Sequence, residues 1–252
     1  MKSDPKVAII LPNYNSDLFL KTTINSVLNQ SYKNWQLIIV DDCSNQKTQS
    51  ILKTFLKNKK IKIFWSKTNR GAAYCRNFAI KKSKSKYLAF IDSDDIWSKE
   101  KLSSQYNFMK KNKIKISHTS YTIINSNNKI IGFRPAKKIQ NYDDLISSCD
   151  IGLSSVMLEK KILKRSKFSN QITKEDYSLW LNLAKKYDIH GLTRNLMKWR
   201  KSDSSLSSNT IQKVKDAFFI YFNQEKQGIF KSLISVIILS VNYLIKYKTT
   251  KK

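Results

Sequence analysis

The amino-acid sequence predicts an α/β protein built on a mostly parallel, Rossmann-like sheet flanked by helices. Two observations support this prediction. Short continuous apolar runs rich in β-branched residues alternate with longer stretches of helical spacing, as they do in parallel sheets covered on both faces. In addition, 41% of the 252 residues are hydrophobic and only 5 are Gly and 3 are Pro, so the chain can bury a sizeable core.

Four apolar runs in the first hundred residues are predicted to be buried strands. They are residues 7–11 (VAIIL, ended by Pro12), 37–40 (LIIV), 61–65 (IKIFW) and 87–91 (YLAFI). Stretches with helical spacing lie between them, at 18–29, 48–56 and 72–82. Because parallel strands need a crossover connection, this order predicts a series of strand–helix–strand units.

The second half of the chain is predicted to be more antiparallel. An amphipathic helix over 100–111 precedes a hairpin over 116–133 that turns at Asn127 and Asn128. A further helix is expected over 177–186, and a serine-rich loop follows Arg200.

The C-terminal segment 232–245 contains no charged residue, and lysines flank it on both sides. Its 14 residues are fewer than the roughly 20 that a membrane-spanning helix needs. Ser232, Ser235 and Asn242 fall near one side of a helical projection, which leaves a broad apolar face. The segment is therefore either an interfacial helix at an anionic membrane or a helix that packs on the protein or on a partner subunit.

The chain carries 47 Lys plus Arg against 18 Asp plus Glu, a net charge of +29, and 41 of the 47 are Lys. Nucleic-acid readers depend on bidentate arginine contacts, so a lysine excess indicates only non-specific attraction to anions. We expect a solvated basic surface or an anionic membrane surface as its role, and no nucleic-acid partner.

The cysteines indicate the compartment. Cys43, Cys75 and Cys149 are odd in number and widely spaced, without the pattern of a zinc site or a disulfide framework. No long apolar segment with a cleavage site follows the N-terminus. We therefore expect a cytoplasmic protein.

The acidic residues gather in a few places. Seven of the 18 fall in the groups 41–42 (DD), 92–95 (DSDD) and 175–176 (ED), and the first two groups directly follow predicted strands. The carboxyl ends of parallel strands meet at one crevice, so both groups should line it. Clustered carboxylates repel one another, and Mg²⁺ or Mn²⁺ held by Asp92 and Asp94 would relieve this repulsion. The alternative for 92–95 is a turn and helix cap.

The phosphate-binding motifs of other α/β proteins are missing. The sequence has no GxGxxG and no GxxxxGK[ST], which argues against a dinucleotide-binding dehydrogenase and a P-loop NTPase. What remains is a crevice in which a cation and basic side chains hold a diphosphate.

Five motifs together resemble the family 2 glycosyltransferases. They are PNYN (12–15), SVLNQSYKNWQLIIVDDCS (26–44), NRGAAYCRNFAI (69–80), YLAFIDSDDIW (87–97) and KEDYSLWL (174–181). The resemblance covers about residues 6–210, and IGLSSVM (151–157) and RKSDSSLSSN (200–209) are similar to bacterial enzymes that build teichuronic acid, O-antigen and capsule. It implies a GT-A fold, in which residues 1–225 form the transferase domain.

Within that domain, the resemblance implies that residues 1–98 bind the nucleotide sugar and 99–225 the acceptor. Residues 226–252, outside this domain, would be a basic and apolar C-terminal helix, for which membrane association and packing on the protein both stay open. The donor would be a nucleotide-diphosphate sugar, by family frequency a UDP-sugar, and the cofactor Mn²⁺ or Mg²⁺. Transfer would invert the anomeric carbon, and the acceptor would be lipid-linked or a polysaccharide, at the inner face of the cell membrane.

The resemblance also assigns roles to single residues. Donor contacts fall to Pro12, Tyr14, Asn15, Asp42, Arg76, Asp92, Ser93 and Arg200, the metal to Asp94 and the general base to Asp176. Pro12 and Tyr14 would flank the nucleobase and Asp42 would accept a hydrogen bond from it. Arg76 would contact base or phosphate, Asp92 would lie near the ribose, and Arg200 would help to bind the diphosphate.

Six further residues are weaker candidates: Asp95, Glu175, Lys201, Ser205, Ser207 and Trp180. Asp95 would be a metal ligand or sugar contact, whereas Glu175 is alternatively a first-turn carboxylate that faces the helix dipole. Trp180 is either a core residue or a wall of the acceptor site. Ser205 and Ser207 would order the closing loop, and Lys201 stands where many relatives have a histidine nearby.

Two alternatives to this enzyme stay open. A noncatalytic sugar-nucleotide-binding or scaffold protein would not need to keep Asp92, Asp94 and Asp176 together. A nucleotidyltransferase also combines a parallel sheet with acidic metal sites, but the glycine-rich basic loop expected near the first strand is absent.

Overall fold

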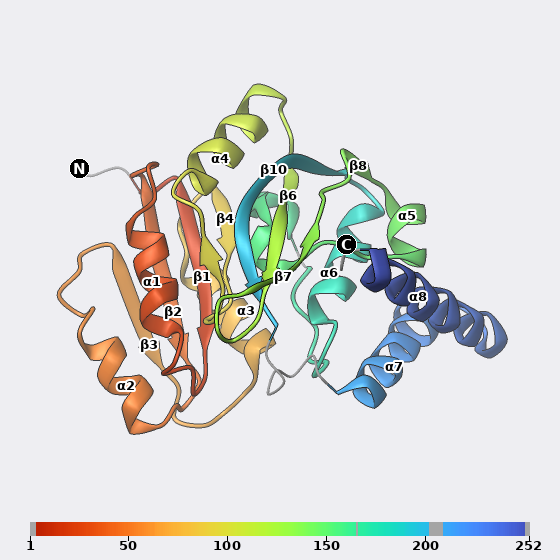
Figure 1. The fold of residues 1–252 in the computed structure, drawn as a ribbon, viewed down its shortest axis with the longest axis horizontal. Helices are drawn as coiled ribbons and strands as arrows, with labels where there is room; N and C mark the ends of the chain where they lie inside the picture. Colours follow the sequence, from red (N-terminus) through yellow and green to blue (C-terminus); the bar gives the residue numbers. More distant parts are fainter. Residues whose placement is uncertain (1–3, 165, 202–208, 250–252) are drawn as a thin grey trace.

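The computed structural model describes residues 4–164, 166–201 and 209–249. Ten strands of this part of the chain form one sheet with helices on both faces (Figure 1). The strand order is β3-β2-β1-β4-β9-β6-β10-β5, with β7 paired to β6 and β8 paired to β10. The predicted α/β class is confirmed.

The first half of the sheet is parallel, as predicted. Its strands are β1 (Val7–Asn13), β2 (Trp35–Asp41), β3 (Ile61–Trp65) and β4 (Tyr87–Phe90). The connecting helices are α1 (Leu20–Leu28), α2 (Gln46–Lys53) and α3 (Ala72–Lys82). The second helix begins two residues earlier than the predicted 48–56, because the Asn45 side chain caps it by accepting from the Thr48 amide at 2.9 Å.

Side chains of β1 alternate between two hydrophobic clusters. Ala8 and Ile10 pack in the cluster that contains α3, whereas Ile9 and Leu11 pack in the cluster that contains α1 and Leu52 of α2. This alternation follows from the two-residue period of a strand. Both faces of the sheet are therefore covered, and its carboxyl edge carries the polar residues.

The second half contains the remaining strands and the middle helices. The strands are β5 (Ile96–Trp97), β6 (Ile116–Ile124), β7 (Ile130–Arg134), β8 (Ile139–Gln140), β9 (Met157–Glu159) and β10 (Ile189–Arg200). The helices are α4 (Lys101–Lys111), α5 (Tyr142–Ser147), α6 (Glu175–Ala184) and the short 3₁₀ turns η1 (Leu153–Ser155) and η2 (Lys160–Ile162).

The predicted hairpin is confirmed as β6 and β7, with Asn125 at its turn accepting from the amides of Asn127 and Lys129. The antiparallel expectation is correct for β5, β7, β8 and β9 but wrong for the long pairing of β6 with β10, which is parallel. That pairing joins segments some seventy residues apart, for example Ser117 with His190, so no local sequence pattern predicts it.

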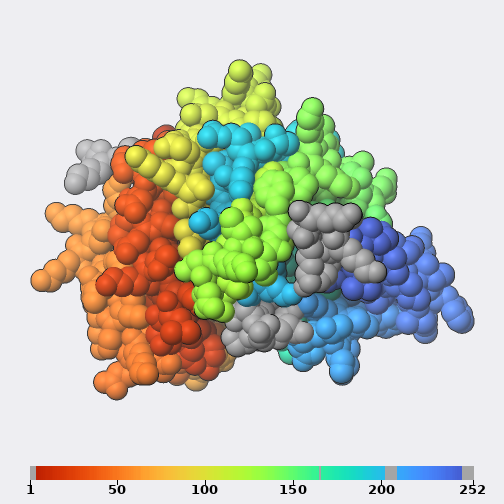
Figure 2. All heavy atoms as spheres, viewed as in Figure 1, coloured from red at the N-terminus to blue at the C-terminus, as the bar shows by residue number. Residues whose placement is uncertain are grey.

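The chain ends in α7 (Thr210–Phe219), a π-helical turn η4 (Ile220–Gln224) and α8 (Ile229–Thr249). Figure 2 shows α7 and α8 forming one end of the molecule. Val236 and Leu239 of α8 are buried, and the Asn242 amide donates to the Ser147 carbonyl of α5 at 3.0 Å. The part of α8 that carries its polar residues therefore packs against the protein.

The other side of α8 is apolar and exposed. Its exposed residues include Phe230, Leu233, Ile234, Ile237, Ile238, Val241, Leu244 and Ile245, with exposed fractions from 43% to 83%. Lys226 and Lys231 beside them are also exposed. Nowhere in the described ranges is a helix both long and apolar enough to cross a bilayer.

Candidate active site

The loops after β1 and β2 interlock at the carboxyl edge of the sheet. Asp41 accepts from the Asn13 side-chain amide at 2.6 Å and from the Ser44 amide at 3.1 Å. Asp42 is 3% exposed and accepts from the backbone amides of Arg70 (2.9 Å) and Gly71 (2.7 Å). Its carboxylate thus fixes the loop that starts α3.

The residues predicted to hold the nucleobase line the entrance of these loops. Pro12 is buried near the end of β1, whereas Tyr14, two residues further on, is 51% exposed. The Asn15 amide donates to Ser44 Oγ at 3.0 Å, and its side chain accepts from the Asn45 amide at 2.8 Å. An exposed ring beside a hydrogen-bonded loop is suited to stacking on a flat ligand.

Arg76 of α3 connects two parts of the molecule. Its guanidinium donates to Asp92 Oδ1 at 2.7 Å and to Glu175 Oε1 at 2.6 Å, and the residue is 4% exposed. Burial alone would lower the pKa of Arg76, but the two carboxylates outweigh it and raise this pKa. The structure therefore places Arg76 beneath the site, where it joins the loop after β4 to the start of α6.

Three carboxylates crowd the loop after β4. Burial, and then the charge of Asp92, raise the pKa of Asp94 to about 6. Asp95 is 1% exposed and accepts from the Arg200 amide at 2.8 Å; burial, and then Asp94 and Asp92, raise its pKa well above the usual range. Asp94 and Asp92 are half-buried, so they are accessible where Asp95 is not.

Arg200 ends β10 and is 2% exposed. Its guanidinium donates to the carbonyls of Asp94 (2.9 Å) and Asn125 (2.9 Å), and it stacks 4.1 Å above the Phe19 ring. Further bonds run to the Ser126 carbonyl at 3.3 Å and to Asn128 Oδ1 at 2.9 Å. In this structure Arg200 ties the β6–β7 turn to the acidic loop, with most of its five N–H groups in use.

Asp176 lies at the first turn of α6, next to Glu175. Its Oδ1 accepts from the Tyr177 amide at 2.7 Å. Burial, and then the charge of Glu175, raise the pKa of Asp176 to about 7. A carboxyl group with a pKa near neutrality is suited to taking up a proton in a reaction.

The sequence also matches a known protein family. Residues 8–169 match the family model described as Glycosyl transferase family 2. The chain belongs to this glycosyltransferase family. It is therefore an enzyme of the glycosyltransferase class.

Curated relatives of this glycosyltransferase cover nearly the whole chain. It is 34% identical over 231 residues (90% of this chain, 92% of the relative) to the putative teichuronic acid biosynthesis glycosyltransferase TuaG of Bacillus subtilis. It is 35% identical over 254 residues (99% of each chain) to WfgD of Escherichia coli. WfgD is a UDP-Glc:alpha-D-GlcNAc-diphosphoundecaprenol beta-1,3-glucosyltransferase.

Solved structures show the same fold. TarS 1–349 of S. aureus in complex with UDP-GlcNAc superposes with a TM-score of 0.70 at 20% identity, covering 92% of this chain and 70% of that one. The mannosyltransferase PcManGT of Pyrobaculum calidifontis, in complex with GDP-Man and Mn²⁺, superposes with a TM-score of 0.69 at 13% identity, covering 93% and 70%. The expected GT-A fold of the glycosyltransferase is thus confirmed.

The structure brings some predicted site residues of the glycosyltransferase together and separates others. Arg76 links Asp92 to Glu175, directly beside Asp176. Trp180 is fully buried against Phe90 and Phe168, so it is a core residue and the acceptor-wall interpretation is wrong.

The weaker candidates lie in different surroundings. Glu175 is both a first-turn carboxylate of α6 and the ion-pair partner of Arg76. Lys201 follows Arg200, and its amide donates to the Ile124 carbonyl at 2.8 Å. The Ser93 carbonyl accepts from Thr23 Oγ1 at 3.0 Å. Ser205 and Ser207 fall outside the described residues.

Other residues that shape the site had no predicted role. Ser154 Oγ accepts from the Asp92 amide at 2.9 Å, and Asn128 holds Arg200. Ser154 lies in the IGLSSVM motif, which was the one available signal for it. Asn128 is part of the predicted hairpin turn, whose position relative to Arg200 depends on the pairing of β6 with β10.

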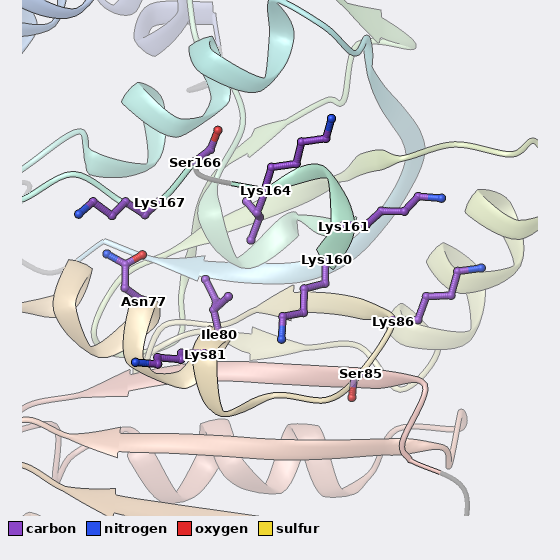
Figure 3. Close-up of a pocket in the computed structure, with 11 residues that line it drawn as sticks. Asn77, Ile80, Lys81, Ser85, Lys86, Lys160, Lys161, Lys164, Ser166 and Lys167 are labelled. Carbon is purple, nitrogen blue, oxygen red and sulfur yellow. The ribbon is translucent and has the colours of Figure 1, made fainter.

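A cavity of about 670 Å³ lies elsewhere, between the C-terminal half of α3 and residues 160–167. Its lining includes Asn77, Ile80 and six lysines, but none of the predicted site residues. Figure 3 shows these lysine side chains spreading outward instead of converging on one point. We therefore place the active site at the carboxyl edge of the sheet and not in this cavity.

Proposed function

We propose that this glycosyltransferase moves a sugar, with inversion, from a nucleotide-diphosphate sugar to a lipid-linked glycan in cell-surface glycan biosynthesis. The observation that carries the proposal is the double ion pair of Arg76. It connects the carboxylate that follows β4, which we assign to the donor site, with the carboxylate pair of α6, to which we assign the proton acceptor. The relatives that act in teichuronic acid synthesis and on diphosphoundecaprenol acceptors support the substrate class.

In this proposal residues 1–98 bind the donor and residues 99–225 the acceptor. The exposed Tyr14 stacks on the nucleobase beside Asn15, Asp42 accepts a hydrogen bond from it, and Asp92 lies toward the ribose. UDP is the first nucleotide to test, because WfgD is named for UDP-Glc and the TarS structure is a complex with UDP-GlcNAc.

A divalent cation, Mn²⁺ or Mg²⁺, fits the acidic loop. Asp92 and Asp94 are accessible carboxylates. Burial, and then the charge of Asp92, raise the pKa of Asp94, and a cation would remove the repulsion between the two carboxylates. Among the described residues no group of three or more His, Cys, Asp or Glu side chains could by itself hold a metal ion. Asp94, with Asp92 beside it, would therefore hold a cation whose other ligands include the donor diphosphate. When bound, the cation neutralises charge on the leaving nucleoside diphosphate.

Asp176 acts as the general base in this proposal. Inverting transfer is one displacement, in which the acceptor hydroxyl attacks the anomeric carbon, loses its proton and expels the nucleoside diphosphate. Asp176 takes up that proton, and its pKa of about 7 makes the ionised form available near neutral pH. Glu175 and Arg76 keep it in position through the ion pair.

We also propose that the enzyme works at the inner face of the cell membrane, with residues 226–252 in contact with lipid. The exposed side of α8 is apolar, its polar side packs on the protein, and exposed lysines lie at its start. An apolar face with basic neighbours is suited to an anionic lipid surface. This position would bring the site to acceptors that are themselves held by lipid.

Calorimetric titration of UDP, with and without Mn²⁺, tests the donor site. We expect binding that depends on the cation and that is lost in Asp94→Ala. Asp143→Ala, which removes an exposed carboxylate from α5, is the matched control and should bind as the wild type does. Tight UDP binding by Asp94→Ala would contradict the metal assignment, and no binding of UDP or of GDP, CDP or dTDP by the wild type would reject the function.

A further inference from the structure

Three lysines from three different segments gather beside the first turn of α6. Lys174 directly precedes Glu175 and Asp176, Lys201 follows β10, and Lys213 lies in α7. All three are half-buried.

Hydrogen bonds fix the position of Lys213 relative to Lys174. The amide and hydroxyl of Thr173 donate to Asp216 Oδ2 of α7 at 2.8 and 2.7 Å. Asp216 is 7% exposed, and its other oxygen accepts from Gln212 at 3.0 Å. Lys213 precedes Asp216 by three residues and therefore lies on the same side of α7, next to Lys174.

Burial and neighbouring charges act on two lysines of this cluster, Lys174 and Lys213. Burial, and then the charges of Lys174 and Lys201, lower the pKa of Lys213. Burial also lowers the pKa of Lys174, although Cys149, Asp176 and Asp216 act in the opposite direction. Across the described part of the chain, neither Lys174 nor Lys213 forms an ion pair within 4.0 Å. Half-buried like charges repel one another, and an anion between them would remove that repulsion.

The backbone at Lys174 adds to this arrangement. Lys174 caps α6 in the left-handed region, with φ 60° and ψ 17°, which residues other than glycine rarely adopt. It precedes the positive end of a ten-residue helix, where backbone N–H groups favour an anion. Backbone and side chains thus favour the same kind of ligand.

We propose that Lys174 and Lys213, with Lys201 beside them, bind the diphosphate of the lipid-linked acceptor. This inference rests on the proposed function. Lys174 is two residues from Asp176, so a sugar carried on a diphosphate held there would present its hydroxyl to the base. Lys213 Nζ lies 5.7 Å above the Tyr243 ring of α8, so the subsite borders the helix along which the lipid chain would run.

The donor also carries a diphosphate, so the experiment must distinguish the two sources. Inorganic diphosphate is titrated into the protein saturated with UDP and Mn²⁺, which occupies the donor site. The test variant is Lys174→Gln/Lys213→Gln, which removes two charges and keeps side-chain length. Lys215→Gln, which changes an exposed lysine of the same helix, is the matched control.

We expect the wild type to bind diphosphate under these conditions and the double variant to bind at least roughly tenfold more weakly. Lys215→Gln should bind as the wild type does. Equal affinity in wild type and double variant, or no binding by the wild type, overturns the inference. If the double variant folds poorly, Lys213→Gln alone should give a smaller loss in the same direction.

Steady-state kinetics form the second arm, with a GlcNAc-diphosphate prenyl lipid and an uncharged alkyl GlcNAc glycoside as acceptors. We expect the double variant to raise KM for the diphosphate acceptor roughly tenfold and to leave KM for the alkyl glycoside and for the nucleotide sugar unchanged. A rise in the donor KM alone would assign the lysines to the donor diphosphate and overturn the inference. Failure of the proposed function can be distinguished from failure of this inference, because in the first case the wild type would bind no nucleoside diphosphate.

Discussion

The two halves of the sheet position their charged residues in different ways. In the half formed by β1 to β4, Asp41 ends β2 and Asp42 follows it, and both are held by groups from adjacent loops, such as the Gly71 amide. In the half formed from β5 onward, Asp176 lies at a helix start whose neighbours come from distant segments, including Lys213 and Arg76. The first arrangement joins loops 28 and 29 residues apart in the sequence, whereas the second includes the contact of Arg76 with Glu175 over 99 residues.

The largest expected effect is a loss of turnover without a loss of UDP binding. Asp176→Asn should lower turnover by about 10²–10⁴-fold, because it removes the base, while UDP affinity in calorimetry stays unchanged. Asp143→Asn, on the exposed start of α5, serves as the control and should keep full turnover. Unchanged turnover in Asp176→Asn would show that the base is another residue.

The second prediction concerns the link between the halves. Arg76→Gln leaves the carboxylates of Asp92 and Glu175 without their cation, so we expect a loss of about 3–5 kcal/mol in the free energy of unfolding, measured in urea. Lys81→Gln, at an exposed position of the same helix, should change it by less than about 0.5 kcal/mol. A loss for Arg76→Gln as small as that of its control would mean that the two halves do not depend on this residue.

The third prediction addresses the surface next to the second half. Replacing Ile234 and Ile237 of α8 by Ser should weaken binding to phosphatidylglycerol-containing vesicles roughly tenfold for each residue, as measured by co-sedimentation. Ile130→Ser changes a residue of β7 that is 65% exposed and should bind vesicles normally. If the α8 variants bind vesicles as the wild type does, α8 is not the membrane contact.

The smallest effect is a shift along the pH axis. Because the base must be ionised, kcat/KM should rise with pH through about 7 and level off above it, following the pKa of Asp176. The charge of Glu175 is the second cause, after burial, of the raised pKa of Asp176. Glu175→Gln removes this charge, so the rise in kcat/KM should move to lower pH. A rise that moves to higher pH, or does not move, would exclude Asp176 as the group that titrates.

The comparison also explains what the sequence could predict. The strands β1 to β4 follow from continuous apolar runs, and the acidic loop follows from its place after such a run. The strand β10 was not predicted, because its pairing with β6 sets its conformation and its burial does not alternate. Arg76 was predicted as a site residue, but its ion pair with Glu175 was not, because the two residues lie 99 positions apart in the sequence.

The sequence also could not predict which of these side chains are exposed. Asp95 belongs to a motif that suggests ligand contact, yet the chain that returns as β10 covers it and leaves 1% exposed. The helical projection of α8 predicted one broad apolar face. Only packing against α5 shows that this face points away from the protein.

The shared ion pairs of Arg76 have a consequence for folding cooperativity. A fragment that ends at residue 98 would keep Arg76 and Asp92 but lose Glu175, and β4 would lose β9, its antiparallel neighbour. The proposed division at residue 98 therefore does not separate two independently folding units. We expect the protein to unfold in a single transition, and we expect residues 1–98 alone not to survive limited proteolysis.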